Sequence, residues 1–277
     1  MKKTYQDLIK ALKKEVKKTG REQVVIGLSG GLDSAVTFKL AIDALGAENV
    51  TALIMPEIGL TKQENIEHAK ILAEHLEAKY YYQPINSFLV SFNFVPWGQN
   101  STSQMNLRSR IRMLLLYHFA NKNNALVLGT SNKSELMLGY GTKYGDLAAD
   151  IEVIGSLYKT EVVDLAIYMD MPEELINKAP SAELAPDQTD EDELGASYAK
   201  LDQILKLYEE ERDEEDIISR GLDPTLTRKT VRRIKANEHK LKLPPILGIK
   251  AQKTAEIAPQ EITEEPIVLE GQQQLFD

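Results

Sequence analysis

The chain has 277 residues, of which 43% are hydrophobic and 27% charged, a composition that excludes collagen-like, mucin-like and wholly disordered proteins. Its net charge of −9 at pH 7 argues against wrapping nucleic acid, because phosphate backbones require a basic surface. The chain has no cysteine, which excludes disulfide frameworks, thiolate metal sites and every mechanism that uses a cysteine nucleophile.

The first half of the chain alternates helical and strand patterns. The expected elements, in chain order, are helix 3–18, strand 24–28, helix 33–45, strand 50–55, helix 61–78, strand 80–85, helix 103–121 and strand 125–128. Thr61 and Glu64 are spaced as a capping box for the helix that starts at residue 61. Near-continuous apolar strands between helices predict an α/β fold, a doubly wound parallel sheet flanked by helices.

The second half is less regular, with loops expected over 139–150 and 180–195. Helices are expected over 158–169, 172–178, 197–210 and 226–239. We predict a single domain over 1–250 and an extended or mobile C-terminal extension over 251–277. The basic start of the chain is not followed by an apolar segment of the kind found in export signals, and no apolar run is long enough to cross a membrane. We therefore expect a cytoplasmic protein with neither a membrane nor a nucleic acid as partner.

A serine- and glycine-rich turn follows the first strand. It consists of Gly27, Leu28, Ser29, Gly30, Gly31, Leu32, Asp33 and Ser34. Glycines let the backbone approach an anion, the hydroxyls add donors, and the N-terminus of the following helix favours negative charge. Asp33 fits beside phosphate when a divalent cation lies between them, which suggests a magnesium ligand. The turn matches neither the Walker A pattern nor GxGxxG, and the alternative is a purely structural turn.

The SGGxDS pattern resembles the pyrophosphatase loop (PP-loop) of the ATP-pyrophosphatase superfamily, whose members adenylate a substrate and release pyrophosphate. Further blocks look like those of NAD synthetases, in order from about residue 5 to residue 245. They are 128–135, 141–146, 149–150, 158–160, 180–184, 188–191, 194–195, 239–240 and 244–245. The resemblance implies a Rossmann-like sheet of the adenine nucleotide alpha-hydrolase type and an ammonia-dependent NAD synthetase.

The same resemblance assigns roles to individual positions. It implies that Asp33 and Glu135 hold Mg²⁺, and that these two residues with Lys159 are the catalytic groups. ATP would be held by residues 27–34 with Thr130, Lys159 and Ser181, and nicotinic acid adenine dinucleotide (deamido-NAD) by Arg110, Lys143, Asp150, His239 and Lys240. Many bacterial members carry GTDHAAE where this chain has GTSNKSE over 129–135.

Three of these residues also have simpler interpretations. Glu135 has the alternative of a solvated helix residue, Arg110 that of a surface ion-pair partner, and His239 that of an exposed residue at a helix end. We favour the metal-ligand role for Glu135, because it follows a strand end, where ligands of parallel sheets bind. We favour the binding role for Arg110, because a dinucleotide diphosphate requires cations.

The reaction implied by the resemblance has two steps. The nicotinate carboxylate attacks the α-phosphate of ATP to give an acyl-adenylate and pyrophosphate, and ammonia then displaces AMP. Glutamine-dependent relatives carry a glutaminase domain with a cysteine nucleophile, and this chain has neither the cysteine nor the length for one. The chain is expected to use free ammonia, unless a separate subunit supplies it, and the resemblance implies a homodimer.

Two alternatives remain at this point. One is another PP-loop adenylating enzyme of the tRNA-modifying type, which the acidic charge disfavours. The other is a non-catalytic ATP-binding module, which the paired carboxylates and Lys159 disfavour. Release of pyrophosphate separates an enzyme from a module, and the identity of the acceptor separates the two enzymes.

Overall fold

The computed structural model describes residues 1–181, 184–185, 189–210 and 213–247. The chain divides into two units, Met1–Leu243 and Pro244–Asp277, and the described helices and strands all belong to the first. The predicted extension over 251–277 lies outside the described residues. The predicted division at residue 250 stays a prediction.

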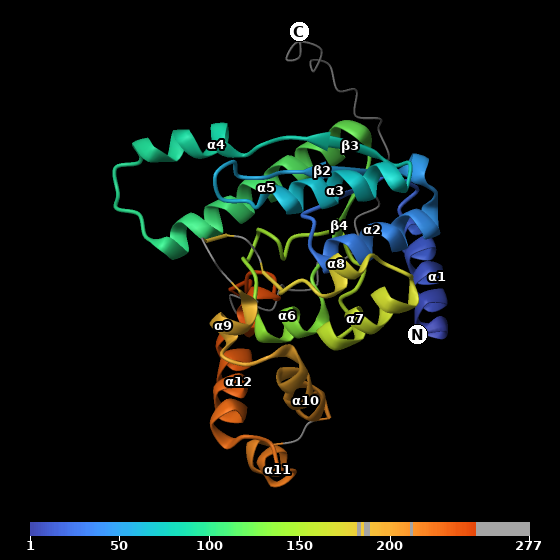
Figure 1. The fold of residues 1–277 in the computed structure, drawn as a ribbon. Coiled ribbons are helices and arrows are strands. Elements are labelled where there is room, and N and C mark those ends of the chain that lie inside the picture. The colour runs from blue at the N-terminus through green and yellow to red at the C-terminus, as the bar shows by residue number, and fades with distance from the viewer. Residues whose placement is uncertain (182–183, 186–188, 211–212, 248–277) are drawn as a thin grey trace, which may run out of the picture. The chain divides into compact units, whose positions relative to one another are not determined.

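The first unit contains one parallel sheet of five strands in the order β3-β2-β1-β4-β5 (Figure 1). The strands are β1 (Val24–Gly27), β2 (Val50–Ile54), β3 (Lys79–Tyr82), β4 (Leu126–Gly129) and β5 (Ile151–Glu152). In the register, Val24 pairs with Val50 of β2 on one side and with Leu126 of β4 on the other. The doubly wound parallel sheet is thereby confirmed. The sequence pattern missed β5, because two residues are too short to show a strand period.

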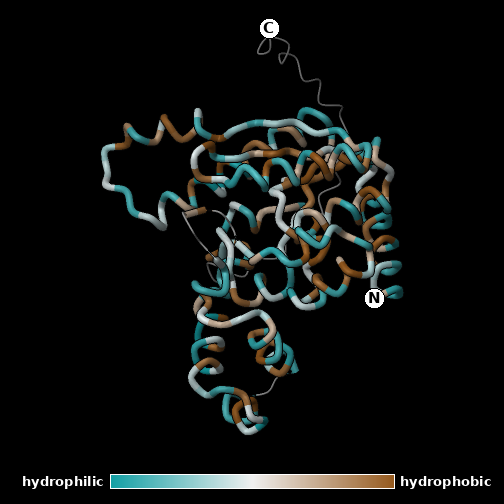
Figure 2. Tube along the Cα trace, viewed as in Figure 1, coloured by the Kyte–Doolittle hydropathy of each residue, from teal (hydrophilic) through white to brown (hydrophobic). Residues whose placement is uncertain are grey.

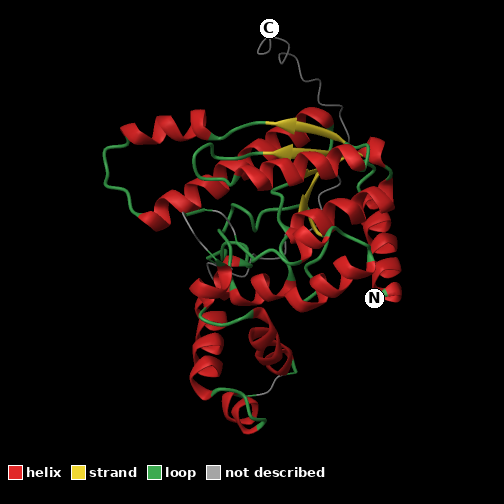
Figure 3. Ribbon diagram, viewed as in Figure 1, coloured by secondary structure: helices red, strands yellow, loops and turns green. Residues whose placement is uncertain are grey.

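Helices connect the strands and fill the second half of the unit (Figure 3). The longer ones are α1 (Lys2–Lys18), α2 (Leu32–Leu45), α3 (Gln63–His75), α5 (Ser101–Asn123), α7 (Lys159–Tyr168), α10 (Tyr198–Glu209) and α12 (Pro224–Asn237). The shorter ones are α4 (Asn86–Val90), α6 (Lys133–Leu138), α8 (Glu173–Ile176), α9 (Asp190–Leu194) and α11 (Glu214–Ser219), with 3₁₀ turns η1 (Ala47–Asn49), η2 (Ser91–Phe94) and η3 (Glu238–Lys240). In the part of the chain that the structure describes, no helix is sufficiently long and apolar to cross a membrane.

Both faces of the sheet are covered by helices. Val24 and Ile26 of β1 pack into a core with α1, α2, α3 and α7, whereas Val25 packs on the opposite face with α5. Because side chains alternate across a strand, a sheet buried on both faces needs apolar residues at every position. This explains why the strands appear in the sequence as unbroken apolar runs.

A third apolar cluster joins the helices of the second half. Leu138 of α6 packs with Leu194 of α9 and with Leu201 and Leu205 of α10. Leu226 and Ile234 of α12 pack against this group. The cluster brings α9, α10 and α12 against α6, which begins just after β4.

The helix predicted over 61–78 is shorter, and its predicted cap is wrong. The structure places the N-cap at Lys62, with no capping hydrogen bond from its side chain. Thr61 Oγ1 instead accepts a hydrogen bond of 3.1 Å from the backbone N–H of Glu57, which closes the preceding turn. The predicted loop over 180–195 contains α9, whose N-cap Thr189 accepts from the Asp192 N–H at 3.2 Å.

The segment around α4 and η2 exposes large apolar side chains. It extends away from the sheet in Figure 1, and Figure 2 shows hydrophobic colour along α4. Phe94 is 82% exposed and Trp97 is 66% exposed, and Val90 is exposed as well. We call residues 86–97 the apolar arm. Single exposed apolar residues are ordinary, whereas larger contiguous apolar patches are typical of association surfaces.

Candidate active site

The strand order places a crevice at the ends of β1 and β4. From β1 the chain continues to β2 and β3 on one side, and it reaches β4 and β5 on the other side. Loops leaving β1 and β4 at their carboxyl ends therefore diverge, and ligands of open α/β sheets bind in the gap between them. A cavity of about 820 Å³ lies at this point, lined by the loops after both strands.

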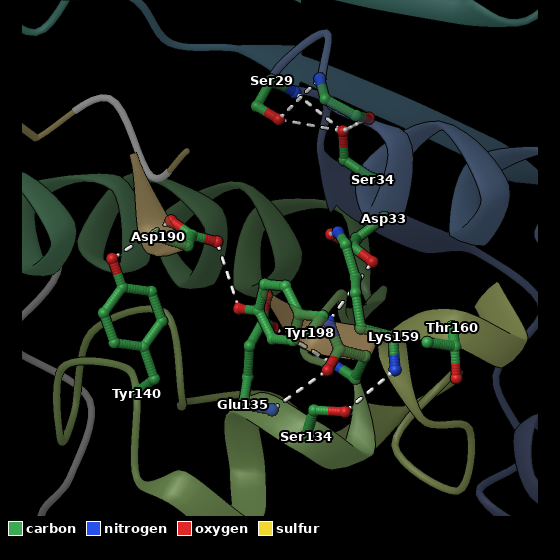
Figure 4. A network of polar contacts seen from close by, with 12 residues as sticks. Ser29, Asp33, Ser34, Ser134, Glu135, Tyr140, Lys159, Thr160, Asp190 and Tyr198 are labelled. Atoms are coloured by element: carbon green, nitrogen blue, oxygen red, sulfur yellow. Dashed lines mark hydrogen bonds and ion pairs between the residues drawn. The ribbon is translucent and has the colours of Figure 1, made fainter. Parts of the chain in front are cut away.

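The loop after β1 is held in shape by its own serines (Figure 4). Ser29 Oγ and Ser34 Oγ are 3.0 Å apart, Ser34 Oγ donates to the Gly31 carbonyl at 3.0 Å, and the Gly31 N–H donates to Ser29 Oγ at 3.2 Å. Gly30 has a φ of +80°, and a Cβ there would overlap the carbonyl of Asn65. Only glycine fits this position. Together with the serine hydrogen bonds, the close contact with Asn65 holds the loop in one shape, and the loop ends at the N-terminus of α2.

Nearly all residues predicted to bind ATP line this cavity. They are Gly27, Leu28, Ser29, Gly31, Leu32, Asp33, Ser34, Thr130, Lys159 and Ser181. Gly30 is not among the lining residues, and its carbonyl accepts a hydrogen bond of 3.2 Å from Lys178 Nζ. Lys178 lines the cavity as well, and the sequence analysis missed it because only the fold places residue 178 beside residue 30.

The three predicted catalytic residues converge from three helices. Asp33, Glu135 and Lys159 each lie in the first turn of a helix, α2, α6 and α7 respectively. Lys159 forms an ion pair with Asp33, and the lysine side chain is only 6% exposed (Figure 4). All three residues line the cavity. Helix N-termini carry partial positive charge, so their convergence favours a polyanionic ligand.

The electrostatics of this cluster follow from burial and like charges. Burial, followed by the charge of Asp33, raises the pKa of Glu135 well above its ordinary value, and Lys159 opposes this shift. Burial lowers the pKa of Lys159, but the attraction of Asp33 and Glu135 outweighs burial, so the net pKa is raised. One ammonium group therefore compensates two carboxyl groups in this cluster.

The donor set fits a magnesium ion. Hard cations prefer carboxylate oxygens, and Mg²⁺ in nucleotide sites is commonly held by one or two carboxylates together with substrate phosphates. Asp33 and Glu135 meet this description. Among the described residues no group of three or more His, Cys, Asp or Glu side chains is arranged to hold a metal ion. Phosphate and water oxygens would therefore complete the coordination of an ion here.

A buried tyrosine–aspartate group adjoins the cluster, and the sequence analysis gave it no role. Asp190 accepts hydrogen bonds from Tyr140 Oη at 3.1 Å and from Tyr198 Oη at 3.2 Å, and all three residues line the cavity (Figure 4). The ring of Tyr198 lies 5.8 Å from Lys159 Nζ. Burial raises the pKa of Asp190, and Lys159 opposes the shift. Asp190 lies in one of the NAD synthetase-like blocks, which was the only sequence signal for it.

Three residues predicted to bind the dinucleotide are joined in the structure. The Arg110 guanidinium lies 3.3–3.4 Å from the Lys143 carbonyl, and Lys143 Nζ donates to the His239 carbonyl at 2.6 Å. Arg110 and His239 are exposed. None of the three lines the cavity, so they form a group on the outer surface.

The other two residues of that set lie apart from each other. Lys240 lines the cavity and its Nζ donates to the carbonyls of Gly139 at 2.7 Å and Gly141 at 3.0 Å. Asp150 lies outside the cavity lining, and its carboxylate accepts from the Val127 N–H at 2.7 Å. Asp150 therefore extends the pairing of β4 with β5.

Glu152 at the end of β5 makes stability depend on pH. Burial raises its pKa from 4.5 to about 7, Asp146 adds to the shift, and a hydrogen bond from the Ser131 backbone opposes it. Its Oε2 atom has no hydrogen-bond partner among the described residues. Since the folded-state pKa is raised, the folded protein binds more protons than the unfolded chain between pH 4.5 and 7, and its stability falls as pH rises through this range.

We expect Glu152→Gln to remove this decrease in the free energy of unfolding. The decrease is about 3 kcal/mol for a single group whose pKa is shifted this far. Urea unfolding of the wild type and the variant at pH 5, 6, 7 and 8 gives the free energy of unfolding of each protein. The comparison is between the slopes of this free energy against pH. Glu22→Gln, at an exposed position, is the control. Equal pH slopes in wild type and Glu152→Gln would contradict the assignment.

The rigid Ser/Gly loop at the switch point, with carboxylates and a buried lysine beside it, places the chain in the class of PP-loop nucleotide-binding α/β proteins. Within this class the chain belongs to the NAD synthase family, whose model matches residues 4–244. The family resemblance of the sequence is thereby confirmed.

Relatives in archaea cover most of the chain. The NH(3)-dependent NAD(+) synthetase of Methanocaldococcus jannaschii is 48% identical over 243 residues, which are 86% of this chain and 93% of that protein. The protein of the same description from Archaeoglobus fulgidus is 46% identical over 85% of this chain and 92% of its own length.

Solved structures agree in fold. The NH3-dependent NAD synthetase from Campylobacter jejuni superposes with a TM-score of 0.77 at 38% identity, covering 89% of this chain and 98% of that one. The NMN synthetase from Francisella tularensis superposes with a TM-score of 0.78 at 32% identity, covering 90% and 98% respectively.

Proposed function

We propose that this chain is a ligase that forms a C–N bond, converting nicotinic acid adenine dinucleotide to NAD with ammonia and ATP and releasing AMP and pyrophosphate. The observation that carries the proposal is the Asp33–Lys159–Glu135 cluster beside the Ser/Gly loop, in a chain of the NAD synthase family. The neighbouring cavity of about 820 Å³ is large enough for a nucleotide.

The difficulty in the first step is that an anionic carboxylate must approach an anionic phosphate. In our proposal the loop over 27–34 and the N-termini of α2, α6 and α7 bind the phosphates of ATP. Asp33 and Glu135 would hold Mg²⁺, which neutralises phosphate charge when it is bound. Lys159 stabilises the negative charge that develops on the α-phosphate, and Thr130 and Ser181 orient the nucleotide. No side chain forms a covalent bond, so the chain acts by positioning and electrostatics.

The proposed nitrogen source is free ammonia. The chain has no cysteine to act as the nucleophile of a glutaminase. The archaeal relatives at 46–48% identity are described as NH(3)-dependent. Because ATP and the dinucleotide are substrates, we place the enzyme in the cytoplasm.

We propose that the dinucleotide is held by Arg110, Lys143, Asp150, His239 and Lys240, and that the enzyme is a homodimer. The apolar arm supports the dimer, because an exposed group that includes Phe94 and Trp97 is typical of an association surface. The outer position of Arg110 and Lys143 supports a binding surface that a second copy helps to enclose. Analytical ultracentrifugation of the wild type and of the double variant Phe94→Ser/Trp97→Ser measures their oligomeric state. It tests whether the apolar arm forms the contact between the two subunits.

The function is tested by incubating the protein with ATP, Mg²⁺ and nicotinic acid adenine dinucleotide, with ammonium or glutamine, and measuring NAD, AMP and pyrophosphate. We expect continuous formation of all three products with ammonium and no NAD with glutamine, where the reaction stops after adenylation. Nicotinic acid mononucleotide is included as a second acceptor, because one structural neighbour is an NMN synthetase. With ammonium present, pyrophosphate without NAD would indicate another acceptor, including the tRNA-modifying alternative, and ATP binding without pyrophosphate would indicate a non-catalytic module.

A further inference from the structure

Asn132 lies between the two carboxylates proposed to hold the metal. It follows β4 and is the N-cap residue of α6, and its side chain is fully buried. This uncharged residue contacts the carboxylates of both Asp33 and Glu135, and Asp33 is in turn paired with Lys159. Buried amides are retained where all their donors and acceptors find partners.

Asn132 makes hydrogen bonds to both metal-binding residues. Its Nδ2 donates to Asp33 Oδ1 at 3.3 Å, and its backbone N–H donates to Glu135 Oε2 at 3.1 Å. Its Oδ1 atom accepts from the Glu135 N–H at 3.0 Å. A single residue therefore orients one carboxylate from α2 and another from α6, although Asp33 and Asn132 are 99 positions apart in the chain.

Helix capping accounts for only part of this arrangement. Asn100 caps α5 with the same reciprocal pattern, accepting from the Ser103 N–H at 2.8 Å while Ser103 Oγ accepts from the Asn100 N–H at 3.0 Å. The cap at Asn132 is equivalent to this one. The Nδ2 contact with Asp33 is additional, because capping uses the side-chain oxygen and leaves the amide donor unused.

We propose that Asn132 is a positioning residue, which holds Asp33 and Glu135 in the orientation that lets both ligate one divalent cation. The inference rests on the proposed metal-binding role of these two carboxylates. Hydrogen bonds to ligating carboxylates fix their orientation, and loss of such a partner typically costs about 10–100-fold in metal affinity. In this site Nδ2 donates to Oδ1 of Asp33 and Lys159 donates to Oδ2, so the two donors together fix both oxygens of that carboxylate.

The test uses Asn132→Ser and Asn132→Thr, with Mn²⁺ as the probe. Serine and threonine retain the cap, since their hydroxyls accept from the same backbone N–H, but neither reaches Asp33 as the amide does. Binding of Mn²⁺ is measured by electron paramagnetic resonance, with and without a non-hydrolysable ATP analogue. Melting temperatures in EDTA report the fold without metal. Asn100→Ser is the matched control, because it makes the same exchange at a cap that does not line the cavity.

We expect both Asn132 variants to melt in EDTA close to the wild type and to bind Mn²⁺ about 10–100-fold more weakly, while Asn100→Ser binds as the wild type does. If the wild type and the Asn132 variants bind Mn²⁺ equally tightly, Asn132 is a helix cap only and the inference is overturned. If the wild type binds no Mn²⁺ with or without the analogue, the proposed metal site itself is wrong, and the inference fails with it.

Discussion

Asp33→Ala is expected to lower the rate of adenylation by about 10³-fold or more while leaving the fold intact. Asp33 faces the cavity, and its removal eliminates one of the two carboxylates proposed for Mg²⁺ and the partner of Lys159. Its removal also leaves the buried Lys159 with Glu135 as its remaining carboxylate partner, so we expect a loss of stability of the kind argued for Lys159 below, without loss of the fold. Exchange of labelled pyrophosphate into ATP, in the presence of the dinucleotide and without ammonia, measures the adenylation step alone.

The matched control is Asp43→Ala on the same helix. Asp43 pairs with Lys39 at 2.7 Å and accepts from Tyr5 Oη at 2.8 Å, away from the cavity. We expect Asp43→Ala to retain full exchange activity. An Asp33→Ala protein that exchanges pyrophosphate at the wild-type rate would refute the assignment of Asp33 to the metal.

Lys159→Met is expected both to abolish adenylation and to destabilise the folded protein by about 3–5 kcal/mol, because removing one partner of a buried pair leaves uncompensated charge. The side chain is 6% exposed, and the substitution leaves Asp33 and Glu135 without their shared cation. Chemical denaturation at pH 7 measures the loss of stability, and pyrophosphate exchange measures the loss of activity.

The destabilisation by Lys159→Met should depend on pH in a defined direction. Lys159 lowers the pKa of Glu135, so its removal raises that pKa further above the ordinary value. A carboxyl whose folded-state pKa is raised stabilises the fold at low pH and loses this contribution as pH rises. The loss of stability should therefore be smaller at pH 5.5 than at pH 8.

Lys39→Met is the control for this variant, because Lys39 forms a partly exposed pair with Asp43 on α2. Such pairs contribute about 1 kcal/mol or less, so we expect little change at any pH. A Lys159→Met protein as stable as the wild type at pH 8 would show that the cluster does not depend on this lysine for charge compensation.

The prediction of the fold from the sequence succeeded where local pattern and tertiary environment agree. Strands buried on both faces must be apolar throughout, and β1, β2 and β4 showed this directly. Prediction failed for β5 and for the cap of α3. The pairing of β5 depends on β4, a distant neighbour, and Thr61 has a competing local hydrogen bond with Glu57.

Part of the site was predictable because it is a continuous segment. The loop over 27–34 carries its own glycines, hydroxyls and helix start, so its chemistry is visible in the sequence. The pairing of Asp33 with Lys159 spans 126 positions, and Lys178 reaches Gly30 across 148. Family resemblance assigned roles to Glu135 and Lys159, but it gave no role to Lys178, Asp190 or Asn132.

The sequence by itself determined the alternation of strands and helices up to β4 and the phosphate-binding turn, because backbone conformation and burial pattern are local properties. Only the tertiary structure decided which charged side chains lie in contact with one another. Three helix N-termini from distant parts of the chain bring Asp33, Glu135 and Lys159 together, and burial then shifts the pKa values of Glu135 and Lys159. The energies of such a cluster depend on distance and solvent exposure, and neither quantity exists until the sheet has formed and the helices have packed on it.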